Sequence, residues 1–263
     1  MIEYLVPAAV RSRVVYGDAL DRSPLYPEEA EAVARAVAKR RAEYAAGRAC
    51  ARAALAELGN APGPIPRDTE RGAPVWPKGF VGSITHTEGY RAAAVARDSD
   101  ILTLGIDAEP HGPLPEGVLD VILATPAERA ALTAHTGRRP DIRWDRLLFS
   151  AKETVYKAWY PFHRRMLGFK EAELLFTHDT GETSGGGTDA APGAVGPDGG
   201  PDDSRGTYTA RLLIPGPLLA EGIGPAVFTG RWIVRNGYVA TAIVVPNEQD
   251  DPLRRTGGES ASS

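Results

Sequence analysis

The sequence predicts an α+β fold, in which antiparallel sheets carry helices packed on one side. Residues 26–58 have the pattern of one or two helices, and residues 142–160 have the pattern of another. Strand-like segments follow each of these helical stretches. The order helix, strands, helix, strands is typical of the α+β class. A chain of 263 residues is also long enough to bury a sizeable core.

The first helical stretch begins at Pro27, where a proline at the first helical position is followed by two acids. Its second half is strongly basic. At 100° per residue, Arg41, Arg48 and Arg52 fall within about 40° of one another on the helix. This narrow basic stripe has three interpretations: a solvated helix surface, an anion-binding site, or a docking face for an acidic partner protein.

Residues 59–80 are rich in proline and glycine and are predicted to form a loop. Arg71 and Lys78 stand on either side of Trp76 in this loop. Cations next to an aromatic ring can hold an adenine nucleotide through phosphate contacts and stacking. The alternative is that both are ordinary loop cations.

A short strand over 81–87 ends in Thr85 and His86, whose side chains could bind phosphate oxygens. Gly82 would let a ligand approach the backbone there. A purely structural histidine is the competing interpretation. Residues 89–97 are predicted to form a strand that pairs with 101–108, with a hairpin turn at 98–100.

Residues 102–109 alternate apolar and polar side chains, which indicates a strand with one apolar face. The period of two places Asp107 and Glu109 on the same face near the strand's end. Two carboxylates so close repel each other unless a cation lies between them, and few hard oxygen ligands favour Mg²⁺. A pair of solvated carboxylates is the alternative.

A helix is predicted to begin at 125–128, where Thr-Pro-Ala-Glu supplies an N-cap, a first-turn proline and an acid. The next helix, 142–160, contains charged residues among apolar and aromatic ones. Glu153 and Lys157 are four residues apart and share one face, while Lys152 lies on the adjacent face. A carboxylate between two amines suits a metal-bound polyphosphate, although an exposed Glu–Lys pair would have the same spacing.

The C-terminal third is predicted to be mostly strands. Residues 181–206 are dominated by glycine and small polar residues, and we expect a flexible insert in a hairpin between strands near 173–176 and 208–212. A second hairpin, 226–245, should turn at Asn236-Gly237. Residues 247–263 are expected to be a disordered tail.

Composition limits the class of protein. A net charge of −4 argues against a general nucleic-acid binder, and no apolar run approaches the length of about 18 residues needed for a membrane span. The start of the chain lacks the pattern of a signal peptide. Cys50 is the only cysteine, so no internal disulfide can form, and we expect a cytoplasmic protein.

Three segments, taken together and in order, resemble the signature of the 4′-phosphopantetheinyl transferases, in the larger, two-lobed, monomeric group. That signature is Gly-Ser-x-Ser/Thr-His, then Gly-Ile-Asp-x-Glu, then Phe/Trp-Ser-x-Lys-Glu-x-x-x-Lys. It corresponds here to residues 82–86, 105–109 and 149–157. Residues 41–55 and 71–79 also match that group.

The resemblance implies two similar α+β lobes related by a pseudo-twofold, with the active site at their junction. We expect an N-terminal lobe over 1–104 and a C-terminal lobe over 105–246, followed by the tail 247–263. The resemblance also implies a monomer.

The implied reaction moves the 4′-phosphopantetheine group of coenzyme A to a serine of an apo acyl or peptidyl carrier protein, leaving 3′,5′-ADP. By resemblance, Asp107, Glu109 and Glu153 hold one Mg²⁺. Glu153, directly or through a metal-bound water, is the expected general base, and Glu153, Lys157 and Asp107 form the catalytic group. Phosphate and adenosine contacts are implied for Arg41, Arg48, Arg71, Lys78, Thr85, His86, Lys152 and Lys157.

The acidic carrier is expected to dock on a basic or apolar groove, for which residues 162–167 are the candidate. Carriers of fatty-acid, polyketide and peptide synthesis all remain open, and a role in secondary metabolism, such as siderophore or polyketide biosynthesis, is expected.

Two alternatives remain. A non-catalytic protein that binds coenzyme A or a carrier would be expected to lack one of Asp107, Glu109, Glu153 or Lys157, and all four are present. A different Mg²⁺-dependent phosphate enzyme, such as a pyrophosphatase, would need a larger carboxylate cluster or a Walker-type loop, and the sequence shows neither.

Overall fold

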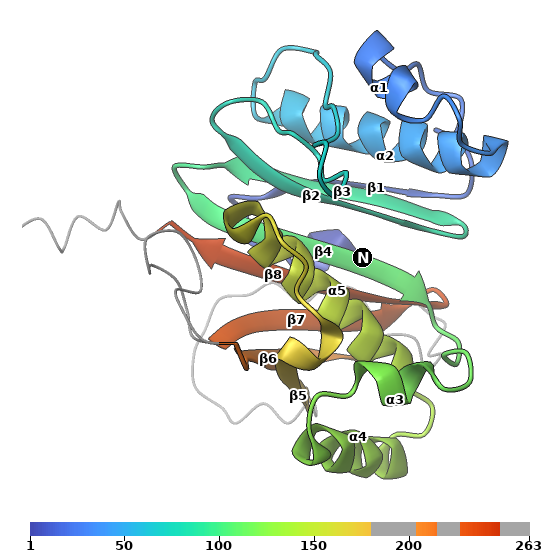
Figure 1. Ribbon diagram of the computed structural model, residues 1–263, viewed down its shortest axis with the longest axis vertical. Coiled ribbons are helices and arrows are strands. Elements are labelled where there is room, and N and C mark those ends of the chain that lie inside the picture. Colours follow the sequence, from blue (N-terminus) through green and yellow to red (C-terminus); the bar gives the residue numbers. More distant parts are fainter. Residues whose placement is uncertain (180–203, 215–226, 248–263) are drawn as a thin grey trace, which may run out of the picture.

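The computed structural model describes residues 1–179, 204–214 and 227–247, and two antiparallel sheets form its framework (Figure 1). The first sheet has the strand order β1-β3-β2 and contains β1 (Arg11–Tyr16), β2 (Phe80–Thr87) and β3 (Tyr90–Arg97). The second has the order β4-β8-β7-β6-β5 and contains β4 (Ile101–Pro110), β5 (Ala172–His178), β6 (Ser204–Leu212), β7 (Val227–Arg235) and β8 (Tyr238–Pro246). The predicted α+β class is confirmed, and each sheet belongs to one lobe.

The N-terminal lobe packs helix α2 (Ala38–Glu57) on the first sheet, with the short helices η1 (Ile2–Tyr4) and α1 (Pro27–Ala32) beside them (Figure 1). Alanines on α2 and on β3 are buried against one another, so helix and sheet approach closely. Gly47 lies at this contact, since a Cβ there would stand 2.9 Å from Ile84. The close approach brings the polar residues of α2 to the edge of β2.

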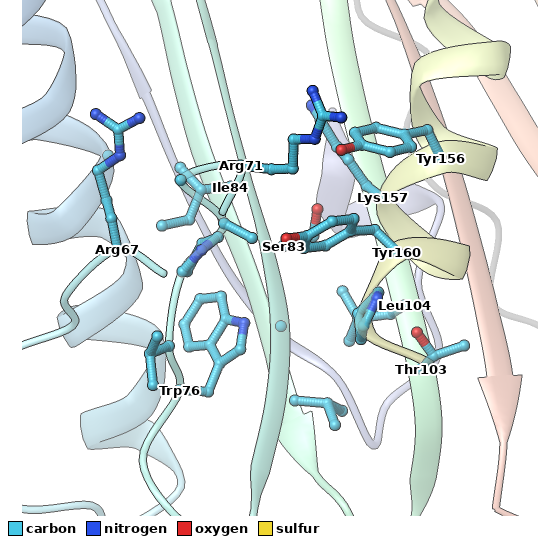
Figure 2. A pocket seen from close by; sticks show the side chains of 18 of the residues that line it. Arg67, Arg71, Trp76, Ser83, Ile84, Thr103, Leu104, Tyr156, Lys157 and Tyr160 are labelled. Atoms are coloured by element: carbon cyan, nitrogen blue, oxygen red, sulfur yellow. The ribbon is translucent and has the colours of Figure 1, made fainter. Parts of the chain in front are cut away.

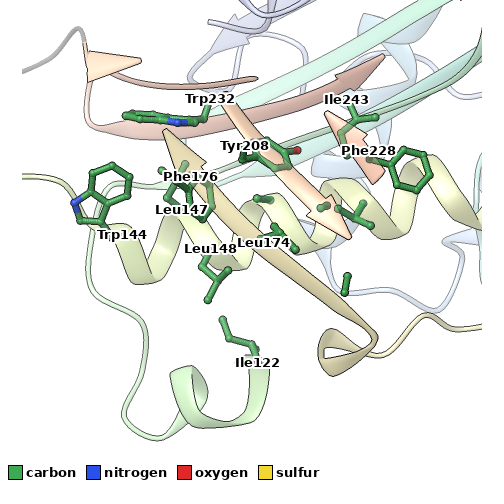
Figure 3. Close-up of a cluster of buried hydrophobic side chains, with 14 of the residues drawn as sticks. Ile122, Trp144, Leu147, Leu148, Leu174, Phe176, Tyr208, Phe228, Trp232 and Ile243 are labelled. Carbon is green, nitrogen blue, oxygen red and sulfur yellow. The ribbon is translucent and has the colours of Figure 1, made fainter. Parts of the chain in front are cut away.

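The C-terminal lobe is organised by helix α5 (Trp144–His163), which lies along the second sheet (Figure 1). Helices α3 (Val118–Ile122), α4 (Pro126–Arg138) and η2 (Phe169–Glu171) complete it. Its core is rich in aromatic side chains, with the rings of Trp144 and Trp232 in edge contact at 5.3 Å between centroids (Figure 3). On β4, Gly105 leaves room for α5, because a Cβ there would stand 2.3 Å from the carbonyl oxygen of Thr154.

The predicted hairpin between 89–97 and 101–108 is wrong. Strand β3 pairs with β1 on one side and β2 on the other, so neither of its edges is free for β4, which pairs with β8. The two sheets meet instead at β2 and β4 through side chains. Ser83 Oγ accepts the N–H of Ile106 at 3.1 Å, and Thr85 Oγ1 accepts the N–H of Ala108 at 3.1 Å.

The other hairpins agree with the sequence. Strands β7 and β8 turn at Asn236-Gly237, whose φ angles of 51° and 75° suit that pair. Strands β5 and β6 pair as predicted, while most of the predicted insert 181–206, and all of the tail but Asn247, lie outside the described residues. The expected lobe boundary at 104/105 falls inside β4, which belongs wholly to the second sheet.

None of the helices in the described part of the chain is long and apolar enough to cross a membrane.

Candidate active site between the lobes

A cavity of about 560 Å³ lies between the two lobes (Figure 2). Helix α2, the loop 67–76, strand β2, the start of β4 and the end of α5 all contribute to its lining. Its apolar part includes Trp76, Phe80 and Leu104. The cations that line it are Arg40, Arg48, Arg67, Arg71, Lys157 and Arg164. The cavity therefore suits an elongated ligand that has several negative charges and an apolar portion.

On the α2 side, Arg48 is held rigidly. It is only 4% exposed, its Nε donates to the carbonyl of Ile65 at 2.7 Å, and its guanidinium lies 4.2 Å from the centre of the Tyr44 ring. Burial lowers the pKa of Arg48, while Tyr44 and Glu29 oppose that effect. A buried guanidinium fixed in this way is preorganised to bind an anion.

His86 faces the same side of the cavity. Arg40 Nη1 donates to His86 Nε2, so the ring proton lies on Nδ1, 3.7 Å from the carboxylate of Glu43. Burial, and then the nearby Arg40, lower the pKa of His86 to about 4. The imidazole is therefore neutral at pH 7 and can donate one hydrogen bond from Nδ1.

Across the cavity, the loop and α5 face each other. Figure 2 shows Arg71 extending from the loop towards Tyr156 and Lys157 of α5. Gly82, predicted to admit a ligand to the backbone, instead makes room for the ring of Trp76, since a Cβ there would stand 2.6 Å from it.

Lys157 and Asp107 connect the cavity to a group of carboxylates. Lys157 Nζ donates to Asp107 Oδ1 at 2.7 Å and to the carbonyl of Ile106 at 3.1 Å. Thr85 Oγ1 donates to the same Oδ1 at 3.1 Å. The other oxygen, Oδ2, is buried without a hydrogen-bond partner. A buried carboxylate oxygen in this position can accept a metal ion or a donor from a ligand.

Glu109 and Glu153 share the electrostatic environment of Asp107. Burial, and then Asp107, raise the pKa of Glu109 to about 7, although Arg146 opposes the shift from 3.3 Å. Burial also raises the pKa of Glu153, an effect that Lys157 opposes and Asp107 increases. Carboxylates that raise one another's pKa values are stabilised by a cation placed among them.

In the described part of the chain, Asp107, Glu109 and Glu153 do not form a closed metal cage. In residues 1–179, 204–214 and 227–247, no three acidic, histidine or cysteine side chains are gathered closely enough to hold a metal ion. Asp107 and Glu109 are instead paired with Lys157 and Arg146. The orphaned Asp107 Oδ2 and the mutual repulsion of the three carboxylates nevertheless fit a divalent cation.

The structure places Lys152, a predicted phosphate contact, away from the cavity. Its ammonium is buried in the C-terminal lobe, 3.0 Å from Glu128, and donates to the carbonyls of Phe169 and Ala172 at 2.8 Å. These contacts use all three of its N–H donors. Lys152 therefore does not line the cavity and holds α5 against α4, η2 and the start of β5.

Three further predicted contacts are not brought to the cavity. Arg41 is exposed and donates to the carbonyl of Ala36, and Lys78 is exposed outside the lining. Thr85 is buried, and its hydroxyl orients Asp107 rather than a ligand. Arg52, the third member of the predicted stripe, pairs with the buried carboxylate of Glu29 at 2.9 Å.

The cavity also contains residues that the sequence reasoning missed. Arg40 and Tyr44 are two of them: they precede the predicted Arg48 at a spacing of four on α2, and all three line the cavity. The spacing itself can be read from the sequence, but the side of α2 that meets the cavity depends on tertiary packing. Arg67, Tyr160 and Arg164 also line it, but only the packing of the lobes reveals them.

Comparisons with known proteins agree with this geometry. Residues 28–96 match the model of the 4′-phosphopantetheinyl transferase N-terminal domain, and residues 103–194 match that of the 4′-phosphopantetheinyl transferase superfamily. The first match covers the α2 side of the cavity, and the second includes most of β4 and all of α5.

Curated relatives cover nearly the whole chain. The transferase Svp of Streptomyces mobaraensis is 50% identical over 247 residues, covering 93% of this chain and 89% of the relative. Npt of Nocardia iowensis is 42% identical, covering 92% and 99%. PptT of Mycobacterium tuberculosis is also 42% identical, covering 93% and 98%. The resemblance found in the sequence is thus confirmed, and the chain belongs to the 4′-phosphopantetheinyl transferase family.

Proposed function

We propose that this transferase moves the 4′-phosphopantetheine group of coenzyme A to a serine hydroxyl of an apo acyl or peptidyl carrier protein, with one Mg²⁺. The observation that supports this proposal most directly is the Lys157–Asp107 pair. It joins a cation-lined cavity to three neighbouring carboxylates. The cavity suits the phosphates of coenzyme A, and the carboxylates suit the metal.

Five of the proposed ligand contacts lie around the cavity. Arg48, Arg71, His86 and Lys157 line it from both lobes, and Arg40 lies beside His86. Arginine side chains bind phosphate oxygens through two parallel donors, while a lysine acts as a compact charge. We assign these residues to the phosphates and the adenosine end of coenzyme A.

Asp107, Glu109 and Glu153 are the residues that would hold Mg²⁺. When bound, the ion would neutralise charge on the pyrophosphate and so favour attack and departure of the leaving phosphate. Lys157, whose side chain lines the cavity, would bind the phosphate oxygens.

Glu153 is the proposed general base. The serine oxygen forms a bond to the phosphorus that bears pantetheine, the bond from that phosphorus to the oxygen of 3′,5′-ADP breaks, and the serine proton passes to the Glu153 carboxylate. Burial raises the pKa of Glu153, an effect that Lys157 opposes, and a carboxylate in this position is a candidate proton acceptor. No enzyme nucleophile is needed.

The carrier protein would approach from the end of α5. Phe162 and Arg164 lie at the cavity, and Met166 beyond them is 53% exposed. A basic and apolar surface next to the catalytic helix is complementary to an acidic carrier. A cytoplasmic location and a monomeric state stay predictions.

The test is intact-mass spectrometry of an apo carrier protein incubated with this protein, coenzyme A and Mg²⁺. Transfer should add about 340 Da to the carrier, and EDTA should prevent the gain. No gain with fatty-acid, polyketide or peptide carriers, with coenzyme A still bound, would favour the non-catalytic alternative.

Glu153→Gln tests the assignment of the base. It should nearly abolish transfer and leave the melting temperature close to that of the wild type, because the side-chain shape is kept. Glu57→Gln, at the exposed end of α2, is the matched control. A Glu153→Gln variant that keeps most of its activity would remove Glu153 from the proton transfer.

A further inference from the structure

The loop that carries Arg71 is folded around one carboxylate. Asp68 Oδ1 accepts the backbone N–H groups of Arg71 at 2.9 Å, Gly72 at 2.6 Å and Ala73 at 3.3 Å. Gly72 has a φ of 78°, and Arg67 pairs with Pro74 across the turn. One oxygen of Asp68 therefore determines the shape of the turn from which Arg71 extends.

The other oxygen of the same carboxylate connects to the opposite lobe. Asp68 Oδ2 accepts the phenolic hydroxyl of Tyr160 at 2.8 Å and Nη1 of Arg164 at 3.3 Å. Both partners lie at the end of α5. The side chain of Asp68 is only 10% exposed, so water competes weakly for these hydrogen bonds.

The titration behaviour agrees with this double role. Burial alone would raise the pKa of Asp68, but hydrogen bonds from the Arg71 N–H, the Tyr160 hydroxyl and neighbouring backbone groups outweigh it and lower that pKa. Burial and the hydrogen bond to Asp68 raise the pKa of Tyr160 to about 12. At neutral pH the pair is thus a carboxylate and a neutral phenol, and the hydrogen bond is charge-assisted.

The position of this contact matters because Tyr160 lines the cavity, as do Arg67 and Arg71, the neighbours of Asp68 in the loop. Tyr160 is one helical turn beyond Lys157, and Arg71 reaches from the loop towards that same part of α5 (Figure 2). The Asp68–Tyr160 hydrogen bond therefore sets how far Arg71, on one lobe, lies from Lys157, on the other.

We propose that Asp68 is a positioning residue for coenzyme A. Through Tyr160 it holds the Arg71 loop against α5, so that cations of both lobes face the phosphates before the substrate arrives. This inference rests on the proposed function, since it takes coenzyme A as the ligand of the cavity. Holding the two sides in place in advance lowers the ordering cost of binding.

Tyr160→Phe is the sharpest test, because it deletes the connecting hydroxyl and leaves the turn around Asp68 Oδ1 intact. Loss of a hydrogen bond to a buried carboxylate should raise both the dissociation constant and the KM of coenzyme A roughly three- to tenfold. The kcat at saturating coenzyme A should stay within about twofold of the wild type, since only ground-state positioning is lost.

Tyr16→Phe is the matched control. It also deletes a tyrosine hydroxyl that makes a hydrogen bond with the other lobe, since Asn236 Nδ2 donates to it at 3.4 Å. Tyr16, however, does not line the cavity. Its dissociation constant for coenzyme A should equal that of the wild type. The dissociation constants are measured by titration calorimetry with coenzyme A, after thermal unfolding has shown that each variant is folded.

Asp68→Asn keeps an acceptor for the turn but replaces Oδ2 with an amide donor. It should raise the dissociation constant of coenzyme A at least as much as Tyr160→Phe does. The double variant should bind coenzyme A as tightly as Asp68→Asn alone, because the two residues act through one hydrogen bond. Unchanged affinity in Tyr160→Phe, an equal loss in Tyr16→Phe, or additive effects in the double variant would each overturn the proposal. The test measures coenzyme A binding directly and does not depend on the transfer assay. A wild-type protein that binds coenzyme A but does not transfer phosphopantetheine would contradict the proposed function, while the binding test of Asp68 would still apply.

Discussion

Lys157 Nζ lies 2.7 Å from Oδ1 of Asp107, and this ion pair joins helix α5 to strand β4 at the edge of the cavity between the lobes. The Asp107 side chain is 6% exposed, whereas the Lys157 side chain is 26% exposed and lines the cavity. The lysine is therefore the member of the pair that a ligand can reach. Under the proposed function, this lysine would bind a phosphate oxygen next to the proposed metal ligand Asp107.

Lys157→Met should lower kcat/KM for transfer by about a hundredfold or more, the usual effect of removing a group that stabilises transferring charge. The change also leaves Asp107 buried without its cation, so the apo protein should be less stable. Steady-state transfer and urea unfolding measure the two effects. Lys39→Met, at an exposed position on α2, is the control, and a Lys157→Met variant with near-normal transfer would contradict the assigned role.

Lys152→Met tests whether Lys152 stabilises the fold or binds phosphate. Because the change leaves Glu128 buried without its charge partner, unfolding free energy should fall by about 3–5 kcal/mol. The additional change Glu128→Gln should recover part of that loss. Urea unfolding checks both values. A variant with wild-type stability but severely reduced transfer would restore the sequence-based prediction that this lysine binds phosphate.

The stability of the protein should depend on pH through His86. Its folded pKa of about 4 lies below the ordinary value of 6.5, so between these two pH values the unfolded chain binds more protons than the folded one. The stabilisation is therefore present above pH 6.5 and is lost as pH falls towards 4.

His86→Asn removes this difference. We expect the variant to lose less unfolding free energy than the wild type when the pH is lowered from 7.5 to 5.0, as measured by urea titration at both values. Equal losses in the two proteins would show that His86 takes up its proton as easily in the folded state as in the unfolded one.

Gly105→Ala should loosen the contact between α5 and β4. The added Cβ would stand 2.3 Å from the backbone oxygen of Thr154 and 3.0 Å from the backbone nitrogen of Ala158, so the helix must move. Overpacking of this kind costs about 1–3 kcal/mol of stability, and the shift should also reduce transfer by displacing Lys157. Gly137→Ala in helix α4, where a Cβ meets nothing within 4 Å, should leave both unchanged or slightly raise stability.

Local patterns in the chain were sufficient for much of this site. A period of two along β4 predicts that Asp107 and Glu109 share a face, and a spacing of four predicts the same for Glu153 and Lys157 on α5. Asn236-Gly237 predicts a tight hairpin because both residues accept positive φ. These features depend on neighbours within a few residues, so they are readable without the fold.

Tertiary packing decided the rest. The pairing of β4 with β8 instead of β3, the burial of Lys152 against Glu128, and the choice of Arg40 over Arg41 as a cavity residue all depend on segments far apart in the chain. The contact of Asp68 with Tyr160 spans the two lobes in the same way. Sequence periodicity gives the face on which a side chain lies, but which surface covers that face follows only from how the helices and sheets pack together.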